Sequence, residues 1–447
     1  MRKSDLMLGL AVVAVVAAAP AYAQTLEEET RATIVTSPVL GAERARLEAV
    51  REARPLAWSE LLPQISLEGA AVDADRSELP KTINIATPIR ELPDYWVATL
   101  RSSTLLFGSG RVWSSTRLAR AQIASAVALY QDAVQNLALE LAQAYGEARS
   151  SRASLEAQEQ LLANLQEQER FARANQREGF LTRTDVAQAE SRVAQARSDL
   201  SRARVRVIQA DEAYMRITGR PPGALEAPAP LAGLPQTLDQ ALESASDHPR
   251  LVAAAANISA SEASVDAAAA NGRMRVFLET SHSRLDVMQS YIGRNIPDLE
   301  RAGGPDYETE QSVSLRVTIP LFSGGSVQAR TRQQRHLRDA ANFDMADGQR
   351  RVHEGVTVAF SLLESSRARV ESSRVRLEAA ELASRGVRRE QQFGQRSMID
   401  VLNQEQELLG ARIAVADAER DLMIAERALA VAVGSTNVLL GQGASAQ

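Results

Sequence analysis

The chain contains an internal repeat with an offset of 215 residues, and this feature restricts its fold more than any other. The matching positions include Leu106-Phe107 with Leu321-Phe322, Ser150-Ser151-Arg152-Ala153 with Ser365-Ser366-Arg367-Ala368, Gly179 with Gly394, Asp185-Val186 with Asp400-Val401, and Gly219 with Gly434. Because the match continues without a gap over more than 110 residues, it indicates a structural duplication. Both copies should therefore follow the same order of secondary structure.

Each copy begins with segments that have the pattern of β-strands. Apolar residues alternate with polar ones at Val313, Leu315, Val317, Ile319 and Leu321, which is the period of a half-buried strand. Three more segments, residues 64–73, 95–107 and 273–285, are candidate partners. The sequence therefore predicts two strands near 64–107 and two near 273–321, each pair joined by a polar loop, at residues 75–94 and 286–307.

Long helices follow the strands in both copies. Residues 94–220 and 321–447 contain no proline, and apolar residues recur every seven positions at Val186, Val193, Leu200, Val207 and Tyr214 and at Val401, Leu408, Val415, Leu422 and Leu429. Sustained heptads predict helices packed side by side as in coiled coils. Glycines at 179 and 394 divide each tract, so we expect long helices near 111–176 and 326–391 and shorter ones near 182–217 and 397–433.

The remaining segments complete the predicted organisation. Residues 1–23 resemble a secretory signal peptide, with Arg2 and Lys3, an apolar stretch from Leu6 to Ala19, and the cleavage site Ala21-Tyr22-Ala23. The first repeat then spans residues 24–218 and starts with N-terminal helices. A linker rich in proline and glycine covers residues 219–247, the second repeat covers 248–433 and starts with a helix, and a flexible tail covers 434–447.

Four strands in an exported protein pose a problem of closure. In a membrane every backbone polar group must be paired, so a sheet there must close, and four strands are too few to close a barrel. Several chains would then have to share one barrel. Charges on the polar side of the strands would suit a water-filled lumen; they are Arg101, Arg273, Arg275, Glu279 and Arg316. A small soluble sheet packed on the helices remains the alternative at this point.

The order strand, "IPLFSGGSVQAR", long helix and "FGQRSMIDVLNQEQEL", preceded by a diverged copy, resembles the TolC-type outer membrane channel proteins. The resemblance covers nearly the whole chain after residue 23. It implies an α+β membrane protein: a homotrimer in which each chain gives four strands to a twelve-stranded barrel in outer membrane lipid. The helices would continue as a long periplasmic tunnel, with the linker around residues 219–247 as a belt. The chain has no cysteine to carry a lipid anchor, so it resembles the unlipidated branch.

The resemblance also implies partners and site residues. Such channels work with a periplasmic adaptor and an inner-membrane transporter of the RND or ABC type in efflux and type I secretion. The pore constriction would lie at Asp400 and Asn403, and contacts that close the tip would involve Arg396, Thr184, Asp185 and Gln391. The adaptor would dock on Gly179, Phe180, Leu181, Thr182, Gly394, Gln395 and Ser397. The junctions between barrel and helices would lie at Phe107, Gly108, Gly110, Pro320, Phe322, Gly324 and Gly325.

The two turns between helices also have a purely structural interpretation. Both read G-x-x-[ST]-x-x-D-V, in which the glycine ends one helix and the hydroxyl and the aspartate cap the next. On this interpretation capping alone would account for Asp185 and Asp400, and the pore role that the resemblance implies remains the alternative.

Other classes of function find little support in the sequence. The four histidines are scattered, and the sequence has neither H-E-x-x-H nor G-x-S-x-G, so we expect no catalytic residues, metal site or cofactor. A net charge of −5 argues against a nucleic-acid partner. The competing hypothesis is a periplasmic coiled-coil adaptor or scaffold without a barrel, which would explain the heptads but not four alternating strands.

Overall fold

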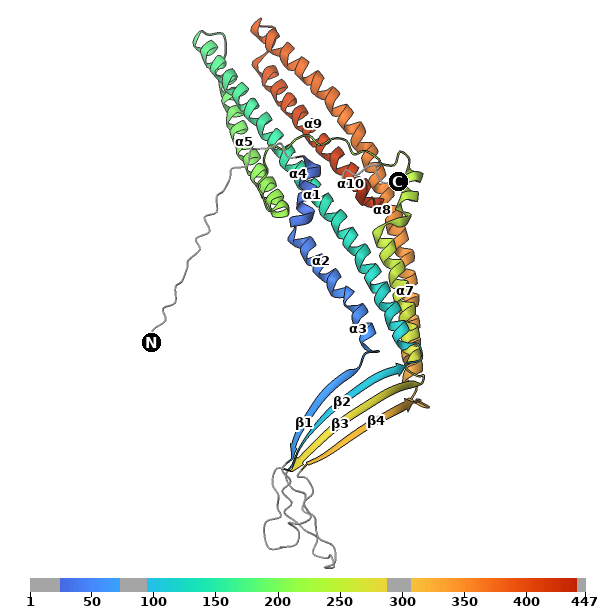
Figure 1. Ribbon diagram of the computed structural model, residues 1–447. Coiled ribbons are helices and arrows are strands. Elements are labelled where there is room, and N and C mark those ends of the chain that lie inside the picture. The colour runs from blue at the N-terminus through green and yellow to red at the C-terminus, as the bar shows by residue number, and fades with distance from the viewer. Residues whose placement is uncertain (1–24, 73–94, 288–306, 440–447) are drawn as a thin grey trace, which may run out of the picture. The chain divides into compact units, whose positions relative to one another are not determined.

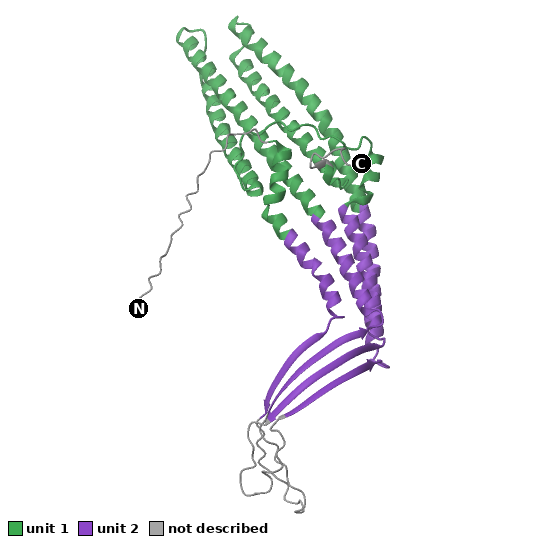
Figure 2. Cartoon of the chain, viewed as in Figure 1, with its two compact units in different colours: residues 1–43, 131–248, 351–447 green, residues 44–130, 249–350 purple. Residues whose placement is uncertain are grey.

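The computed structural model describes residues 25–72, 95–287 and 307–439. The predicted signal peptide, the two polar loops between paired strands and the end of the predicted tail lie largely or wholly outside the described residues. The chain divides into two compact units, one of residues 1–43, 131–248 and 351–447 and one of residues 44–130 and 249–350 (Figure 2). Each unit therefore combines segments of both repeats.

The second unit holds a four-stranded antiparallel sheet in the order β1-β2-β3-β4 (Figure 1). The strands are β1 (Gln64–Val72), β2 (Tyr95–Phe107), β3 (Arg275–Val287) and β4 (Tyr307–Thr318). Each repeat contributes one β-hairpin, and the β2–β3 ladder, in which Leu100 pairs with His282, joins the two repeats. The duplication thus gives two equivalent β-hairpins that meet in one sheet.

One face of the sheet is largely apolar in the part of the sheet that is near the helices. Residues that oppose each other in an antiparallel pair project from the same face, so the register of the strands identifies the apolar residues of this face. They are Ile65, Leu67, Leu100, Val276, Leu278, Val313, Leu315 and Val317. We name this set the apolar face. Leu67, Val313 and Leu315 are each more than 60% exposed, which is unusual for large apolar side chains of a soluble sheet. Toward the end of β3 the same side becomes polar at His282 and Arg284.

The opposite face carries charged residues even in the part of the sheet near the helices. Arg316 donates two hydrogen bonds to Glu279 Oε2, at 3.0 and 2.7 Å, and the hydroxyls of Ser281 and Ser312 lie 2.8 Å apart. Arg101 and Arg275 lie on this face as well. In the part of the sheet near the helices, the alternation that the sequence showed therefore separates apolar from polar residues, whereas toward the end of β3 the Arg284–Asp286 ion pair lies on the side of the apolar face.

Three predicted strand limits differ from the structure, at the end of β4 and at both ends of β3. β4 ends at Thr318, so Ile319 and Leu321 lie outside it although they continue the alternation, and Leu321 is 94% exposed. β3 begins at Arg275 and continues to Val287. Pro320, which has no N–H to donate, follows the last paired residue of β4, and sheet pairing stops before it.

Glycines in left-handed conformations make the turns from strand to helix. After Phe107, the last residue of β2, the chain turns at Gly108, Ser109 (φ 48°) and Gly110 (φ 88°). After β4 the turn uses Gly324 (φ 62°) and Gly325 (φ 77°). A residue with a Cβ is strained at such φ values, which favours glycine at 110, 324 and 325, and Ser109 adopts a positive φ despite its Cβ. Phe322, just before the second turn, is 87% exposed.

The helices of the sheet-containing unit belong to both repeats. They are most of α2 (Pro38–Arg51), α3 (Ala53–Ser59), α7 (Pro249–Ala270), and the first parts of α4 (Arg111–Arg177) and α8 (Ser326–Gln392). Arg117 of α4 pairs with Asp266 of α7 at 3.1 Å. A Cβ at Gly272 would lie 3.0 Å from Val327 Cγ1, so the turn before β3 approaches the start of α8 closely.

The first unit is helical. The later part of α4 pairs with α5 (Arg183–Thr218), and the later part of α8 pairs with α9 (Met398–Ala432) (Figure 1). We name these pairs the first hairpin and the second hairpin. α1 (Leu26–Thr36), α6 (Leu238–Ser244), the 3₁₀ helix η1 (Ala245–Asp247) and α10 (Thr436–Leu439) complete the unit. None of the described helices is both long and apolar enough to cross a bilayer.

Two apolar cores hold the first unit together. One places Leu234, Ala241 and Ala245 of the linker against α8 and α9, through Val356, Leu363 and Leu429 among others. The other joins the two hairpins, with Leu161, Leu165, Ala189, Val193, Met398, Leu402 and Leu409 as members. Of the heptad residues of the sequence, Val193 thus belongs to the core between the hairpins and Leu429 to the core with the linker.

Candidate functional site at the hairpin turns

The turns at the ends of both hairpins share one backbone geometry. Gly179 and Gly394 have φ values of 82° and 72°. The next residue in each turn closes a 6→1 hydrogen bond, from Phe180 N to Asn175 O (2.9 Å) and from Gln395 N to Glu390 O (2.8 Å). This is the Schellman motif, which satisfies carbonyl groups at a helix end. We name these segments, residues 178–182 and 393–397, the first and second tip turns.

Capping boxes start the returning helices. Thr182 and Asp185 exchange side-chain and backbone hydrogen bonds at the start of α5, and Ser397 and Asp400 do so at the start of α9. The Ser397 hydroxyl donates to Asp400 Oδ2 at 2.7 Å, and this bond is the main reason why the pKa of Asp400 is lowered from its ordinary value. Asp400 is therefore ionised at neutral pH and fixed by its own turn.

The other residues of the predicted closing contacts have local partners. Arg396 Nε pairs with Glu390 Oε2 at 2.8 Å, and Gln391 Nε2 lies 3.5 Å from Met398 Sδ. Thr184 is exposed in the first turn of α5. The contact from Arg396 to Thr184 that the resemblance implies stays a prediction, because in this conformation the arginine is engaged within its own hairpin.

Asn403, predicted to face the pore, contacts the other hairpin. Arg192 of α5 donates to Asn403 Oδ1 at 3.1 Å. If residue 403 were an aspartate, Arg192 would lie beside its carboxylate and offset its negative charge. The charge at position 403 therefore depends on Arg192.

Both tip turns expose an aromatic side chain. Phe180 and Phe393 are each 79% exposed. Leu181, beside Phe180, is partly buried and contacts the core between the hairpins. Each tip turn thus presents one exposed phenylalanine, an apolar side chain of the kind that protein partners bind.

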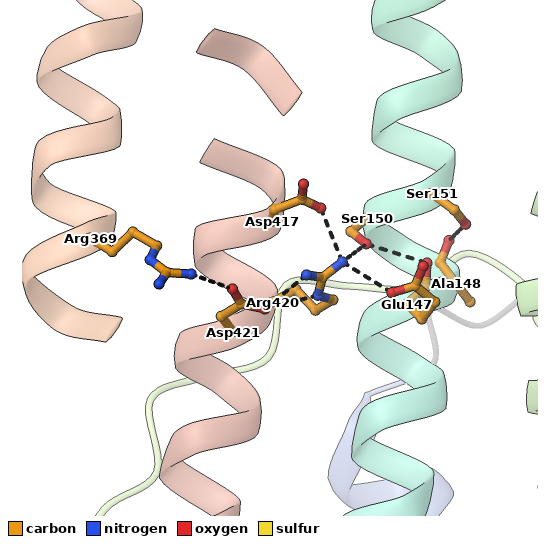
Figure 3. A network of polar contacts seen from close by, with 8 residues as sticks. All are labelled: Glu147, Ala148, Ser150, Ser151, Arg369, Asp417, Arg420 and Asp421. Atoms are coloured by element: carbon orange, nitrogen blue, oxygen red, sulfur yellow. Dashed lines mark hydrogen bonds and ion pairs between the residues drawn. The ribbon is translucent and has the colours of Figure 1, made fainter. Parts of the chain in front are cut away.

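Below the tip turns, a polar network that the sequence did not reveal joins the hairpins. Arg420 of α9 donates to Glu147 Oε2 (3.0 Å) and lies 3.4 Å from the Ser150 hydroxyl, both on α4 (Figure 3). Arg420 also donates to Asp421 Oδ1 at 2.9 Å, and Arg369 of α8 donates to the other oxygen of Asp421 at 3.0 Å. Asp417, one turn earlier on α9, accepts from Arg420 too, and burial raises its pKa.

A glycine permits the approach of the helices at this network. A Cβ at Gly146 of α4 would lie 2.6 Å from Met423 Cε and 2.9 Å from Arg420 Cγ. The absence of a side chain at 146 therefore lets α9 lie against α4 where Arg420 crosses between them.

A second link is centred on Glu405 of α9, nearer to the tip turns. Its side chain is buried and accepts hydrogen bonds from Asn164 of α4 and from Ser384 and Arg388 of α8. The sequence carried a signal for it, because Glu405 interrupts the apolar stripe formed by Val401, Leu402, Leu408 and Leu409. A charge in such a stripe needs partners, but sequence spacing does not say which.

In the parts of the chain that the structure describes, no three His, Cys, Asp or Glu residues are grouped so as to hold a metal ion. What the site offers is exposed turns, a pair of fixed carboxylates, and polar links between two hairpins, which suits binding and movement.

Comparisons with known proteins agree with this description. The outer membrane efflux protein family matches residues 30–220 and 238–435. The chain is 30% identical over 396 residues to the outer membrane efflux protein BepC of Brucella suis biovar 1, covering 87% of this chain and 84% of BepC. A shorter match, 29% identical over 133 residues, links it to the alkaline protease secretion protein AprF of Pseudomonas aeruginosa and covers 30% of this chain and 27% of AprF.

A solved structure shares the fold. The outer membrane protein VceC of Vibrio cholerae superposes with a TM-score of 0.73 at 19% identity, over 92% of this chain and 96% of VceC. Members of the matched family are channel proteins rather than enzymes. The family match spans both repeats, and therefore the chain belongs to the outer membrane efflux protein family and acts as an exit channel of the outer membrane.

Proposed function

We propose that three copies of the chain close their sheets into one twelve-stranded barrel, and that their hairpins form a periplasmic duct. The observation that carries this proposal is the open sheet: β1 and β4 each pair on one side only within the described residues, and the apolar face is exposed. Unpaired strand edges and exposed apolar side chains are both unfavourable in a lone chain. Pairing β1 of one copy with β4 of the next, and immersing the apolar face in lipid, satisfies both.

The dimensions of the strands support the same assembly. β1 has 9 residues and β2 has 13, and a tilted strand of about 9–11 residues spans a bilayer. The polar face, with the Arg316–Glu279 pair, would then line a wet lumen.

The duct would export either small efflux substrates or secreted proteins, since BepC is an efflux protein and AprF a protease secretion protein. It would receive them from an inner-membrane transporter of the RND or ABC type through a periplasmic adaptor. The tip turns would provide the adaptor surface, centred on Phe180 and Phe393. Asp400 and Asn403 would lie at the constriction, which opens when the hairpins move.

A direct test combines fractionation with conductance. The expected result is a detergent-resistant trimer in the outer membrane fraction that forms ion-conducting pores in planar bilayers. A monomeric protein in the soluble periplasmic fraction would contradict the proposal and favour the coiled-coil scaffold. Replacing Phe180 and Phe393 by serine should leave the trimer intact but abolish its co-purification with a periplasmic adaptor from the same cells.

A further inference from the structure

The carboxylate of Glu405 has an unusual environment for a charged group. It is only 2% exposed and lies within the apolar core between the hairpins. Leu161 and Leu165 of α4 and Leu402 and Leu409 of α9 belong to that core. Since a buried charge is costly unless it is fully hydrogen-bonded, its partners determine how firmly the helices around it are held.

The two oxygens of Glu405 are divided between the two hairpins. Oε1 accepts from Ser384 Oγ at 3.0 Å and Arg388 Nε at 2.7 Å, both on α8 of its own hairpin. Oε2 accepts from Asn164 Nδ2 at 2.7 Å, on α4 of the other hairpin. Asn164 is held in this orientation because its own Oδ1 accepts from Gln160 Nε2 at 3.0 Å. One carboxylate thus bonds both hairpins at once.

The duplication supplies an internal comparison. Shifting Arg388 and Glu405 by the repeat offset gives Arg173 and Glu190, which also form an ion pair, at 3.0 Å. The side chains of that pair are 52% and 48% exposed, and both come from the first hairpin. The two repeats thus share an Arg–Glu pair within a hairpin. Glu405 differs from Glu190 in being buried and in its bond to Asn164 of the other hairpin.

We propose that Glu405 and Asn164 form a latch that holds the two hairpins together and that must release before the duct opens. The inference rests on the proposed function, because only a duct that opens at its tip needs such a latch. Glu405 is buried and Asn164 is partly buried, so water competes less for their bond than for a surface contact, and breaking the bond removes one donor from the carboxylate. Glu405 and Asn164 act on the pore through the helices that carry them and are positioning residues.

A charge-swap experiment tests the latch. Asn164→Asp replaces the donor Nδ2 by an acceptor oxygen, so it removes the bond to Glu405 and places a second carboxyl group beside it. In the double variant Asn164→Asp with Glu405→Gln, the introduced amide donates to the aspartate while its oxygen still accepts from Ser384 and Arg388. The matched control is Glu190→Gln, which alters the equivalent exposed pair in the first hairpin.

The readouts are the open probability of purified trimers in planar bilayers and the sensitivity of cells to a large hydrophilic antibiotic that the outer membrane excludes. Asn164→Asp should raise the open probability at least about tenfold, the change that corresponds to losing one hydrogen bond to a charged group. The double variant and Glu190→Gln should lie within about twofold of the wild type, because hydrogen bonding is restored in the first and the second changes only an exposed pair.

Other outcomes overturn the latch. If assembled Asn164→Asp trimers conduct like the wild type, or if Glu405→Gln fails to reverse the effect of Asn164→Asp, the pair does not control opening. A lower yield of Asn164→Asp trimers with unchanged conductance per trimer would show a purely structural role. If wild-type trimers form no pores at all, the proposed function itself fails, and the latch with it.

Discussion

Gln135 of α4 offers a sharp prediction about how the C-terminal end of the chain is held. Its side chain is fully buried, and its Nε2 donates to Gly434 O at 2.8 Å and to Thr436 Oγ1 at 2.7 Å. Gln135→Glu keeps the shape of the side chain but removes the donor. The Thr436 hydroxyl can rotate and donate to the new carboxylate, whereas the Gly434 carbonyl can only accept and is left facing a negative charge.

The expected cost follows from these contacts. One hydrogen bond is worth about 1 kcal/mol, and an unsatisfied buried carbonyl costs about 1–3 kcal/mol more. The free energy needed to open the segment around Gly434 and Thr436 should therefore fall by at least about 2 kcal/mol. This corresponds to about 30-fold faster hydrogen exchange at the amides of Gly434 and Ser435, which bond to Val431 O and Ala430 O in the native turn.

Mass spectrometry of peptides that cover residues 430–439 measures this exchange. The matched control is Asn136→Asp, which makes the same change from amide to acid on the exposed neighbour of Gln135 and should cost only a few tenths of a kcal/mol, about twofold in exchange. Equal exchange in the Gln135→Glu variant and the wild type would refute the reasoning, since it would mean that the two hydrogen bonds do not hold the segment.

Three further predictions concern assembly, selectivity and pH. Gly324→Val with Gly325→Val should reduce the yield of heat-resistant trimer on gels, because both glycines have positive φ; wild-type yield would contradict this. Asn403→Asp alone should change cation selectivity little in bilayer recordings, because Arg192 pairs with the new carboxylate, but adding Arg192→Gln should raise it; equal selectivity would remove position 403 from the constriction. The pKa of Asp400 is lowered in the folded chain, so its capping box stabilises α9 above the unfolded pKa of about 3.9, and this is lost as pH falls through the folded pKa. Hydrogen exchange in the first turn of α9 should then show easier opening at low pH, with a flatter pH dependence in Asp400→Asn.

The duplication made much of the fold predictable. Positions such as Gly179 and Gly394, or Asp185 and Asp400, carry the same local chemistry in both copies, and the structure shows the same Schellman turn and the same capping box at each. Local rules of this kind depend on neighbours within a few residues, so a sequence states them directly. The end of β4 was misjudged because Ile319 and Leu321 continue the alternation, while Pro320 prevents the pairing that a strand needs.

The links between the hairpins could not be predicted in the same way. Glu405 meets Asn164, and Arg420 meets Glu147, across distances of more than 200 residues in sequence. Their equivalents in the other repeat do not repeat the contacts, since Val205 replaces Arg420 under the repeat offset. Such contacts depend on which helix faces which, and periodicity gives only the face of one helix at a time. The interrupted stripe at Glu405 marked the position but not the partner.

The β2–β3 ladder has a consequence for the order in which the protein can be made. Leu100 and His282 are neighbours in the sheet, yet the whole first hairpin lies between them in sequence. After β1 and β2 have been synthesised, the edge of β2 that pairs with β3 therefore stays without a partner until the second repeat has been synthesised and exported. A two-stranded ribbon is marginally stable at best, and a waiting edge invites wrong partners. Periplasmic chaperones that shield unpaired strands should thus be needed longer for this chain than for a barrel built from consecutive hairpins.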